Sequence, residues 1–173
     1  MSDGVEDAGL LRRLQLPLSV DAPGPLSILV YAVAPVPTGH EYLLLRRIPS
    51  QGGFWQGVTG TVEPGEALDE AAIRELTEET ALAPMRLLAV NYEYRFPLRT
   101  RSAGRSHLHQ ITEHVFLALL SAKVDPTIDS IEHDAWDWFP YEEALKWLRW
   151  PGNIEALKRC ETLVNPGAPQ QQP

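Results

Sequence analysis

The sequence predicts a mixed α/β fold: an α/β/α sandwich in which helices cover both faces of a mixed central sheet. Three observations indicate this class. Short runs rich in β-branched and aromatic residues recur between turn signals, which is typical of strands. One helical run lies among these strands, and two more helices follow the last of them. A chain of 173 residues with 44% hydrophobic residues is long enough to build one domain around such a sheet.

Six strands are expected from local composition. The first covers residues 26–34 (LSILVYAVA), a Pro-rich turn follows, and residues 42–47 (YLLLRR) return as its hairpin partner. A Gly-rich loop at 50–54 leads into the next strand. The remaining strands are expected at residues 56–61, 86–95, 111–120 and 136–139, with a polar loop between the second and third of these.

The central helix is predicted over residues 66–80. A Val-Glu-Pro-Gly turn precedes it, no Pro or Gly interrupts it, and Pro84 follows its end. Acidic residues crowd its first turn, where the helix dipole favours negative charge. Two further helices are expected at 141–150 and 153–164, separated by Pro151 and Gly152.

Three glutamates of the central helix, Glu75, Glu78 and Glu79, stand at positions i, i+3 and i+4. At 3.6 residues per turn they share an arc of roughly 100°. Like charges at this spacing cost about a few tenths of a kcal/mol per pair, and helix propensity does not require them. A divalent cation would turn this repulsion into ligation, and oxygen donors suit Mg²⁺ or Mn²⁺. The alternative is a solvated acidic helix face.

The complete pattern around this helix resembles the signature of the Nudix hydrolase family. Residues 60–82 follow the spacing Gly-x5-Glu-x7-Arg-Glu-Leu-x-Glu-Glu-x-Ala-Leu, nearly position for position. Many fixed positions in one register make this a specific signal. One position departs from the family: Ala81 stands where a Gly usually ends the helix, and we expect only the C-cap to change. The resemblance also implies the Nudix-type α/β/α sandwich.

Shorter matches outside the signature look like bacterial dihydroneopterin triphosphate pyrophosphohydrolase. They lie at residues 54–60 (FWQGVTG), 112–116 (TEHVF) and 132–133 (EH). The resemblance implies a Mg²⁺-dependent pyrophosphohydrolase that converts a (deoxy)nucleoside triphosphate or dihydroneopterin triphosphate to a monophosphate and pyrophosphate. Diadenosine polyphosphates or ADP-ribose are the alternative substrates, the latter because Pro97 is similar to a feature of ADP-ribose pyrophosphatases. A nucleotide-binding Nudix module without turnover is the alternative from another class.

The resemblance also implies roles for individual residues. Glu75, Glu78 and Glu79 are expected to bind the metal, together with the backbone carbonyl of Gly60. The metal would neutralise phosphate oxygens and lower the pKa of a bound water, while a carboxylate accepts its proton. A fourth carboxylate from a strand is expected to act as ligand or general base, and the alternative for it is a plain surface position. The expected catalytic residues are therefore Glu78, Glu79, Glu113 as this fourth carboxylate, and Arg74, which either orients the acids by pairing with Glu66 or contacts phosphate.

The candidate substrate-binding residues are basic or aromatic. Trp55 precedes the catalytic loop and is expected to stack on a purine or pterin ring, with core packing as the alternative. An acid-free run between residues 95 and 112 carries several arginines, whose guanidinium groups match phosphate oxygens. The alternative for this run is a solvated loop. The basic candidates are Arg47 at the end of a strand, Arg99, Arg101 and His107.

Composition narrows the partners and the compartment. A net charge of −8 argues against a partner that is a nucleic acid polymer but permits an anionic small molecule held by metal ions and local arginines. Apolar runs fall short of the roughly 18 residues needed to span a membrane. The single cysteine, Cys160, cannot form an internal disulfide, which favours a reducing cytoplasm. We expect a monomer or homodimer with a flexible arm at 1–25, the Nudix domain at 26–164 and a disordered tail at 165–173.

Overall fold

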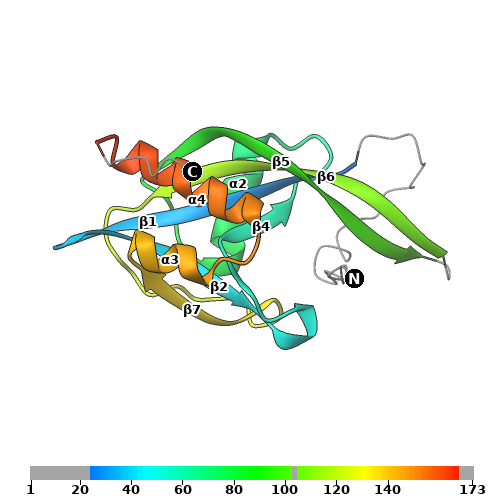
Figure 1. Cartoon of the computed structure of the whole chain (residues 1–173), viewed down its shortest axis with the longest axis horizontal. Coiled ribbons are helices and arrows are strands. Elements are labelled where there is room, and N and C mark those ends of the chain that lie inside the picture. The colour runs from blue at the N-terminus through cyan, green and yellow to red at the C-terminus, as the bar shows by residue number, and fades with distance from the viewer. Residues whose placement is uncertain (1–23, 103–104, 168–173) are drawn as a thin grey trace.

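A mixed sheet flanked by helices forms the body of the protein (Figure 1). The computed structural model describes residues 24–102 and 105–167, except for the side chains of residues 100–107. The strands are β1 (Leu26–Val36), β2 (Gly39–Arg47), β3 (Trp55–Gln56), β4 (Val58–Thr61), β5 (Arg86–Ser102), β6 (Arg105–Leu119) and β7 (His133–Phe139). The helices are α2 (Leu68–Thr80), α3 (Tyr141–Trp147) and α4 (Pro151–Val164), and a 3-10 turn, η1, covers Pro49–Gln51. The predicted α/β class is confirmed.

Strand β1 lies at the centre of the sheet. The strand order is β3-β2-β1-β6-β5, with β4 also pairing with β1 and β7 with β2. The β1–β6 pair is parallel, whereas β1 is antiparallel to both β2 and β4. The register sets Ser27 of β1 beside Glu113 on one side and beside Thr61 on the other. Residues far apart in the sequence therefore meet at the start of β1.

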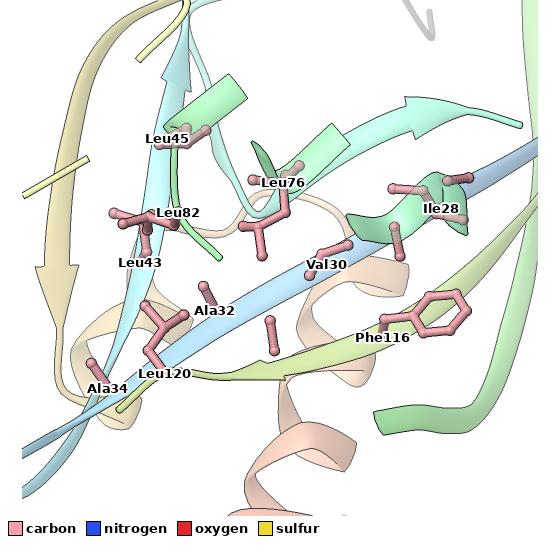
Figure 2. Close-up of a cluster of buried hydrophobic side chains, with 14 of the residues drawn as sticks. Ile28, Val30, Ala32, Ala34, Leu43, Leu45, Leu76, Leu82, Phe116 and Leu120 are labelled. Atoms are coloured by element: carbon pink, nitrogen blue, oxygen red, sulfur yellow. The ribbon is translucent and has the colours of Figure 1, made fainter. Parts of the chain in front are cut away.

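The side chains of β1 alternate between two hydrophobic cores, because successive residues of a strand point to opposite faces of the sheet. Ile28, Val30 and Ala32 pack with Leu76 of helix α2 and Phe116 of β6 (Figure 2). We call this side of the sheet the α2 face. The near-continuous apolar sequence of β1 follows from its burial on both faces.

The other side of the sheet, the α4 face, is covered by helices α3 and α4 (Figure 1). Leu29 and Tyr31 of β1 pack there with Ala144 of α3 and Leu157 of α4. Cys160 is also buried in this core, and burial raises the pKa of its thiol. A packed structural role fits this cysteine better than that of a nucleophile.

Helix α2 begins and ends as its sequence predicts, within two residues. The Glu70 carboxylate accepts a hydrogen bond from the backbone N–H of Ala67 at 3.1 Å and so caps the first turn. At the other end Ala81 adopts a left-handed conformation with φ of 57°, and its N–H donates to the carbonyl of Thr77. The backbone thus keeps the helix end for which glycine is best suited, although alanine occupies it.

The polar loop predicted between residues 95 and 111 is wrong. Strand β5 continues to Ser102 and β6 begins at Arg105, so the two form one long antiparallel hairpin that projects past the helices (Figure 1). The polar and Pro-containing sequence suggested a loop. However, β5 lies at the end of the strand order, and an edge strand tolerates Pro97.

Smaller differences concern the element boundaries. The predicted Gly-rich loop at 50–54 starts inside η1, and α3 ends at Trp147, earlier than expected. Helix α4 starts at Pro151, so that Gly152, taken from sequence as a helix break, lies inside its first turn. In the described part of the chain, no helix is long and apolar enough to cross a membrane. The arm expected at 1–25 and the tail expected at 165–173 fall mostly outside the described residues.

Candidate active site

Two of the three glutamates predicted as ligands on helix α2 are buried, so the alternative of a solvated acidic face does not hold for them. Glu75 is 1% exposed and Glu79 3% exposed, whereas the side chain of Glu78 is 46% exposed. Burying carboxylates costs free energy unless other groups compensate their charge. The local sequence supplies the helix, and packing of its apolar side against the α2 face carries two of the acids into the protein.

Arg74 supplies the first compensating charge. Its Nε and Nη2 donate to the two carboxylate oxygens of Glu66 at 2.7 and 2.8 Å, which is the pairing that the sequence predicts. Its Nη1 donates to Oε1 of Glu75 at 2.6 Å and lies 3.4 Å from Oε2 of Glu78. The hydrogen bond to Glu66 is the main cause that raises the pKa of Arg74, so the guanidinium stays charged. Arg74 therefore holds the acidic side chains in fixed positions.

Gly60, the penultimate residue of β4, allows the backbone to approach these carboxylates. A Cβ at residue 60 would lie 2.0 Å from Cδ of Glu75, closer than any real contact. Nη2 of Arg74 also donates to the carbonyl of the next residue, Thr61, at 3.0 Å. Only a residue without a side chain leaves room for the Glu75 carboxylate here, which explains why glycine occupies this position.

Glu113 is buried and lies on the α4 face of the sheet. It is 4% exposed, so the alternative of a plain surface residue does not hold. Oγ of Ser27 lies 3.2 Å from Oε1 of Glu113 and 3.0 Å from the carbonyl oxygen of Gly60. The hydroxyl of Tyr94 donates to Oε2 of Glu113. Ser27 thus connects Glu113 to the backbone at Gly60, although the glutamates of α2 belong to the opposite face.

The donor set fits a hard divalent cation by its chemistry. Every candidate ligand is a carboxylate or carbonyl oxygen, as Mg²⁺ prefers, and the missing Cβ at Gly60 brings its backbone against the Glu75 carboxylate. Among the described residues, no group of three or more His, Cys, Asp or Glu side chains is already gathered in a metal-binding arrangement. The guanidinium of Arg74 lies between the carboxylates of Glu66 and Glu75 instead.

His133, the first residue of β7, is a buried neighbour of the cluster. Its Nε2 lies 3.9 Å from Oε2 of Glu79, and its ring has no exposed surface. Burial, followed by the charge of Arg47, lowers the pKa of His133 to about 4, so the ring is neutral at neutral pH. The backbone of Asp129 also binds the carbonyl of Glu79, which ties the segment before β7 to the end of α2.

Arg47 points into the protein and not toward solvent. It is 1% exposed, and its Nη1 donates to Oε2 of Glu132 at 2.7 Å. Its backbone N–H donates to the carbonyl of Phe54 at 2.9 Å, which holds the loop before β3. This position favours a structural role for Arg47 over the predicted phosphate contact, because a ligand would have to displace Glu132.

The other substrate candidates lie on different elements. Trp55 is half-buried and packs edge-on against Phe139 at 5.6 Å, with Trp147 at 5.7 Å, so core packing accounts for it. Arg99 is exposed on β5, which is a strand and not the expected loop. The predicted residues Arg101 and His107 lie on β5 and β6, and their side chains are outside the described part of the chain.

Sequence reasoning did not assign a role to Ser27, Tyr94 or His133. Ser27 occupies one position in an otherwise apolar strand, and Tyr94 lies in a run that is ordinary for a strand. Only the strand register brings Ser27 and Tyr94 to either side of Glu113. A polar residue in an apolar central strand was the one available signal, because burying it requires a hydrogen-bond partner.

Comparison with known proteins identifies the family and the fold of the chain. The family model for the NUDIX domain matches residues 28–160. The chain is 30% identical over 126 residues to "Dihydroneopterin triphosphate diphosphatase" of Haemophilus influenzae, covering 69% of this chain and 78% of that protein. The structure of the E. coli dihydroneopterin triphosphate pyrophosphohydrolase superposes with a TM-score of 0.65 at 27% identity, covering 83% of this chain and 98% of the other.

A further relative is longer. The chain is 38% identical over 143 residues to a protein of Myxococcus xanthus named octanoyltransferase. The matched part is 82% of this chain but spans only 38% of that protein. The family match covers more than half of the chain and includes both the acidic helix and the strands that surround it. This protein therefore belongs to the Nudix family.

Proposed function

We propose that this protein is a Mg²⁺-dependent pyrophosphohydrolase that cleaves a (deoxy)nucleoside triphosphate or dihydroneopterin triphosphate to the monophosphate and pyrophosphate. The observation that carries the proposal is the burial of Glu75 and Glu79 on one side of α2, with Glu75 packed against Gly60. Glutamates are seldom fully buried, and clusters of buried carboxylates are typical of functional sites. Hydrolysis of a phosphoanhydride bond is the chemistry that such a cluster suits.

The residues divide the work as follows. Glu75, Glu78 and Glu79, with the carbonyl of Gly60, would hold the Mg²⁺ ion, and Mn²⁺ satisfies the same oxygen donors. When bound, the ion supplies neutralisation of phosphate oxygens and activation of water. Arg74 holds the acids in position by its hydrogen bonds to Glu66 and Glu75. A fourth carboxylate, that of Glu113, serves as a further ligand or as the general base.

The substrate is proposed from the relatives and from the surface. The Haemophilus influenzae relative is named as a dihydroneopterin triphosphate diphosphatase, and this chain covers 78% of it. A triphosphate offers an oxygen-rich chain for the cation and for the exposed Arg99, and Arg101 and His107 follow on the same hairpin. The net charge of −8 disfavours a nucleic acid polymer, whereas a small anionic molecule can still be held by metal ions and local arginines.

The decisive experiment is a hydrolysis screen of the purified protein. Dihydroneopterin triphosphate, the common (deoxy)nucleoside triphosphates, ADP-ribose and diadenosine tetraphosphate are each incubated with Mg²⁺, and products are separated by ion-exchange chromatography. We expect pyrophosphate and a monophosphate from one of the triphosphates, and loss of turnover with EDTA. Turnover of ADP-ribose or the dinucleotide alone would replace the proposed substrate with one of the alternatives.

Two controls make the screen conclusive. Glu79→Gln removes one proposed ligand, whereas Glu142→Gln removes an exposed carboxylate of α3 and should leave turnover unchanged. If no compound is cleaved but one of them binds in calorimetry, the protein is a binding module and the proposal fails.

We place the activity in the cytoplasm, since the only cysteine is buried and free. Light scattering distinguishes a monomer from a homodimer.

A further inference from the structure

One carboxylate of the site is held by two hydroxyl groups from neighbouring strands. Tyr94 of β5 donates to Oε2 of Glu113, and Oγ of Ser27 lies 3.2 Å from Oε1. Each oxygen of the carboxylate therefore has its own hydroxyl neighbour. The terminal torsion of a glutamate is intrinsically broad, so contacts at both oxygens fix its orientation where packing alone does not.

Ser27 also lies beside the backbone carbonyl of Gly60, which is one of the proposed metal ligands. Its Oγ lies 3.0 Å from the carbonyl oxygen of Gly60. A serine hydroxyl carries one proton, so it donates to either Gly60 or Glu113 at any moment. The two acceptors are thus coupled, because a change at the Gly60 carbonyl alters the share of that proton available to Glu113. Tyr94 provides a second donor that does not depend on this division.

Helix α4 is shaped to accommodate Tyr94. A Cβ at Gly152 would lie 2.5 Å from Cε2 of the Tyr94 ring, so the first turn of α4 has room for the ring only because residue 152 is glycine. Beside it, the hydroxyl of Tyr31 donates to the backbone carbonyl of Asn153 at 2.9 Å. On the α4 face, the partly buried Tyr94 therefore bonds to the carboxylate, whereas the fully buried Tyr31 bonds to the helix backbone.

We propose that Tyr94 is a positioning residue which, together with Ser27, holds the Glu113 carboxylate in one orientation beside the Gly60 carbonyl. This inference rests on the proposed function, because Glu113 must be a ligand or the general base for its orientation to matter. Tyr94 itself is not proposed to contact metal or substrate. It acts on the reaction through Glu113, in the way that outer hydrogen bonds orient the ligands of metal sites.

The test compares two tyrosine variants. Tyr94→Phe removes the bond to Glu113, and Tyr31→Phe removes a bond of the same kind on the same face that ends on the helix backbone. For each variant we would measure kcat and KM for the substrate found in the screen, the dissociation constant of Mn²⁺ from substrate-free protein by calorimetry, and the thermal midpoint. Both variants should lower the thermal midpoint similarly, which controls for a purely structural effect.

Only Tyr94→Phe should affect the site. If Glu113 is the base, kcat should fall about 10- to 100-fold with Mn²⁺ affinity unchanged, and if Glu113 is a ligand, Mn²⁺ affinity should fall by a similar factor. Either result supports the proposal, provided that Tyr31→Phe stays within twofold of the wild type in both quantities. Equal losses of kcat and of Mn²⁺ affinity in the two variants would overturn it.

A double-mutant cycle separates positioning from other effects. In the Glu113→Gln background, Tyr94→Phe should have no further effect on kcat or on Mn²⁺ affinity, since its action passes through the carboxylate. The same fold-loss in both backgrounds would overturn the inference while leaving the proposed function intact. A wild-type protein that cleaves no phosphoanhydride and binds no Mn²⁺ would overturn the proposed function, and this inference with it.

Discussion

The close approach of Gly60 to Glu75 makes Gly60→Ala the most informative single change for stability. The added Cβ would lie 2.0 Å from Cδ, 2.2 Å from Cγ and 2.3 Å from Oε1 of Glu75. Carbon atoms in contact prefer about 3.5 to 4.0 Å, so the carboxylate has to move by more than an ångström. It is 1% exposed and bonded to Arg74 at 2.6 Å, and therefore cannot move without losing that bond.

The size of the effect follows from these two losses. Overpacking a buried site costs about 1 to 3 kcal/mol, and loss of a hydrogen bond to a charged group costs about 1.5 to 3 kcal/mol. We expect Gly60→Ala to lower the free energy of unfolding by about 3 to 5 kcal/mol. Urea denaturation followed by circular dichroism measures this quantity, with an unchanged m-value as the sign that the unfolded state is unaffected.

Two further variants test the cause. Gly65→Ala is a matched control, because Gly65 has φ of 82° but no atom within 4 Å of a built Cβ, so only backbone strain of about 1 to 2 kcal/mol should appear. In the Glu75→Ala background, Gly60→Ala should cost far less than in the wild type, since the clashing atoms are gone. A cost below about 1 kcal/mol, or an equal cost in both backgrounds, would refute the steric account.

Three other outcomes are expected. Glu79→Gln should lower kcat in the hydrolysis assay by orders of magnitude, while the thermal midpoint measured by calorimetry stays the same. Activity within about threefold of the wild type would show that Glu79 is not a metal ligand. Ala81→Gly should raise the free energy of unfolding by about 1 kcal/mol in urea, because φ of 57° favours glycine, and a loss would show that the alanine methyl group is needed. The pKa of His133 in the folded protein is about 4, below the usual value of 6.5, so the unfolded chain binds a proton first as the pH falls. The free energy of unfolding of metal-free protein should therefore be full above pH 6.5 and fall by about 3 kcal/mol as the pH decreases toward 4. In His133→Asn this part of the pH dependence should vanish, and an unchanged profile in urea titrations would contradict the assignment.

Periodic, local features of the chain were predictable from the sequence. The apolar positions of α2 and its acidic first turn depend on residues three and four apart, so the helix appears within two residues of its expected start. The pairing of Arg74 with Glu66 was one of the roles implied by the family resemblance, and the structure shows this pair. The hairpin of β5 and β6 was not predicted because Pro97 suggested a loop. A strand tolerates proline at the edge of a sheet, and the order of strands in the sheet cannot be read from the segment itself.

Burial of the site residues depended on tertiary structure. Sequence alone left open whether Glu113 and the glutamates of α2 face solvent, because alternation along the strand was not clean. The parallel pairing with β1 places Glu113 beside Ser27 and inside the protein. Arg47 illustrates the reverse case: an arginine at a strand end suggests a ligand contact, yet the bulged pairing of β2 with β7 buries it against Glu132.

The charges around Arg74 favour a bound cation. Glu66, Glu75 and Glu78 surround one guanidinium, that of Arg74, so three carboxylates and one positive group carry a formal charge of −2. Glu79 adds another carboxylate nearby, and its neighbour His133 contributes no charge at neutral pH. Negative charge that is partly buried, at Glu75 and Glu79, raises the free energy of the folded state, and a divalent cation carries charge that offsets it. The arginine thus holds the acids in place without neutralising them, and the remaining negative charge is what would attract Mg²⁺ with its phosphate-bearing substrate.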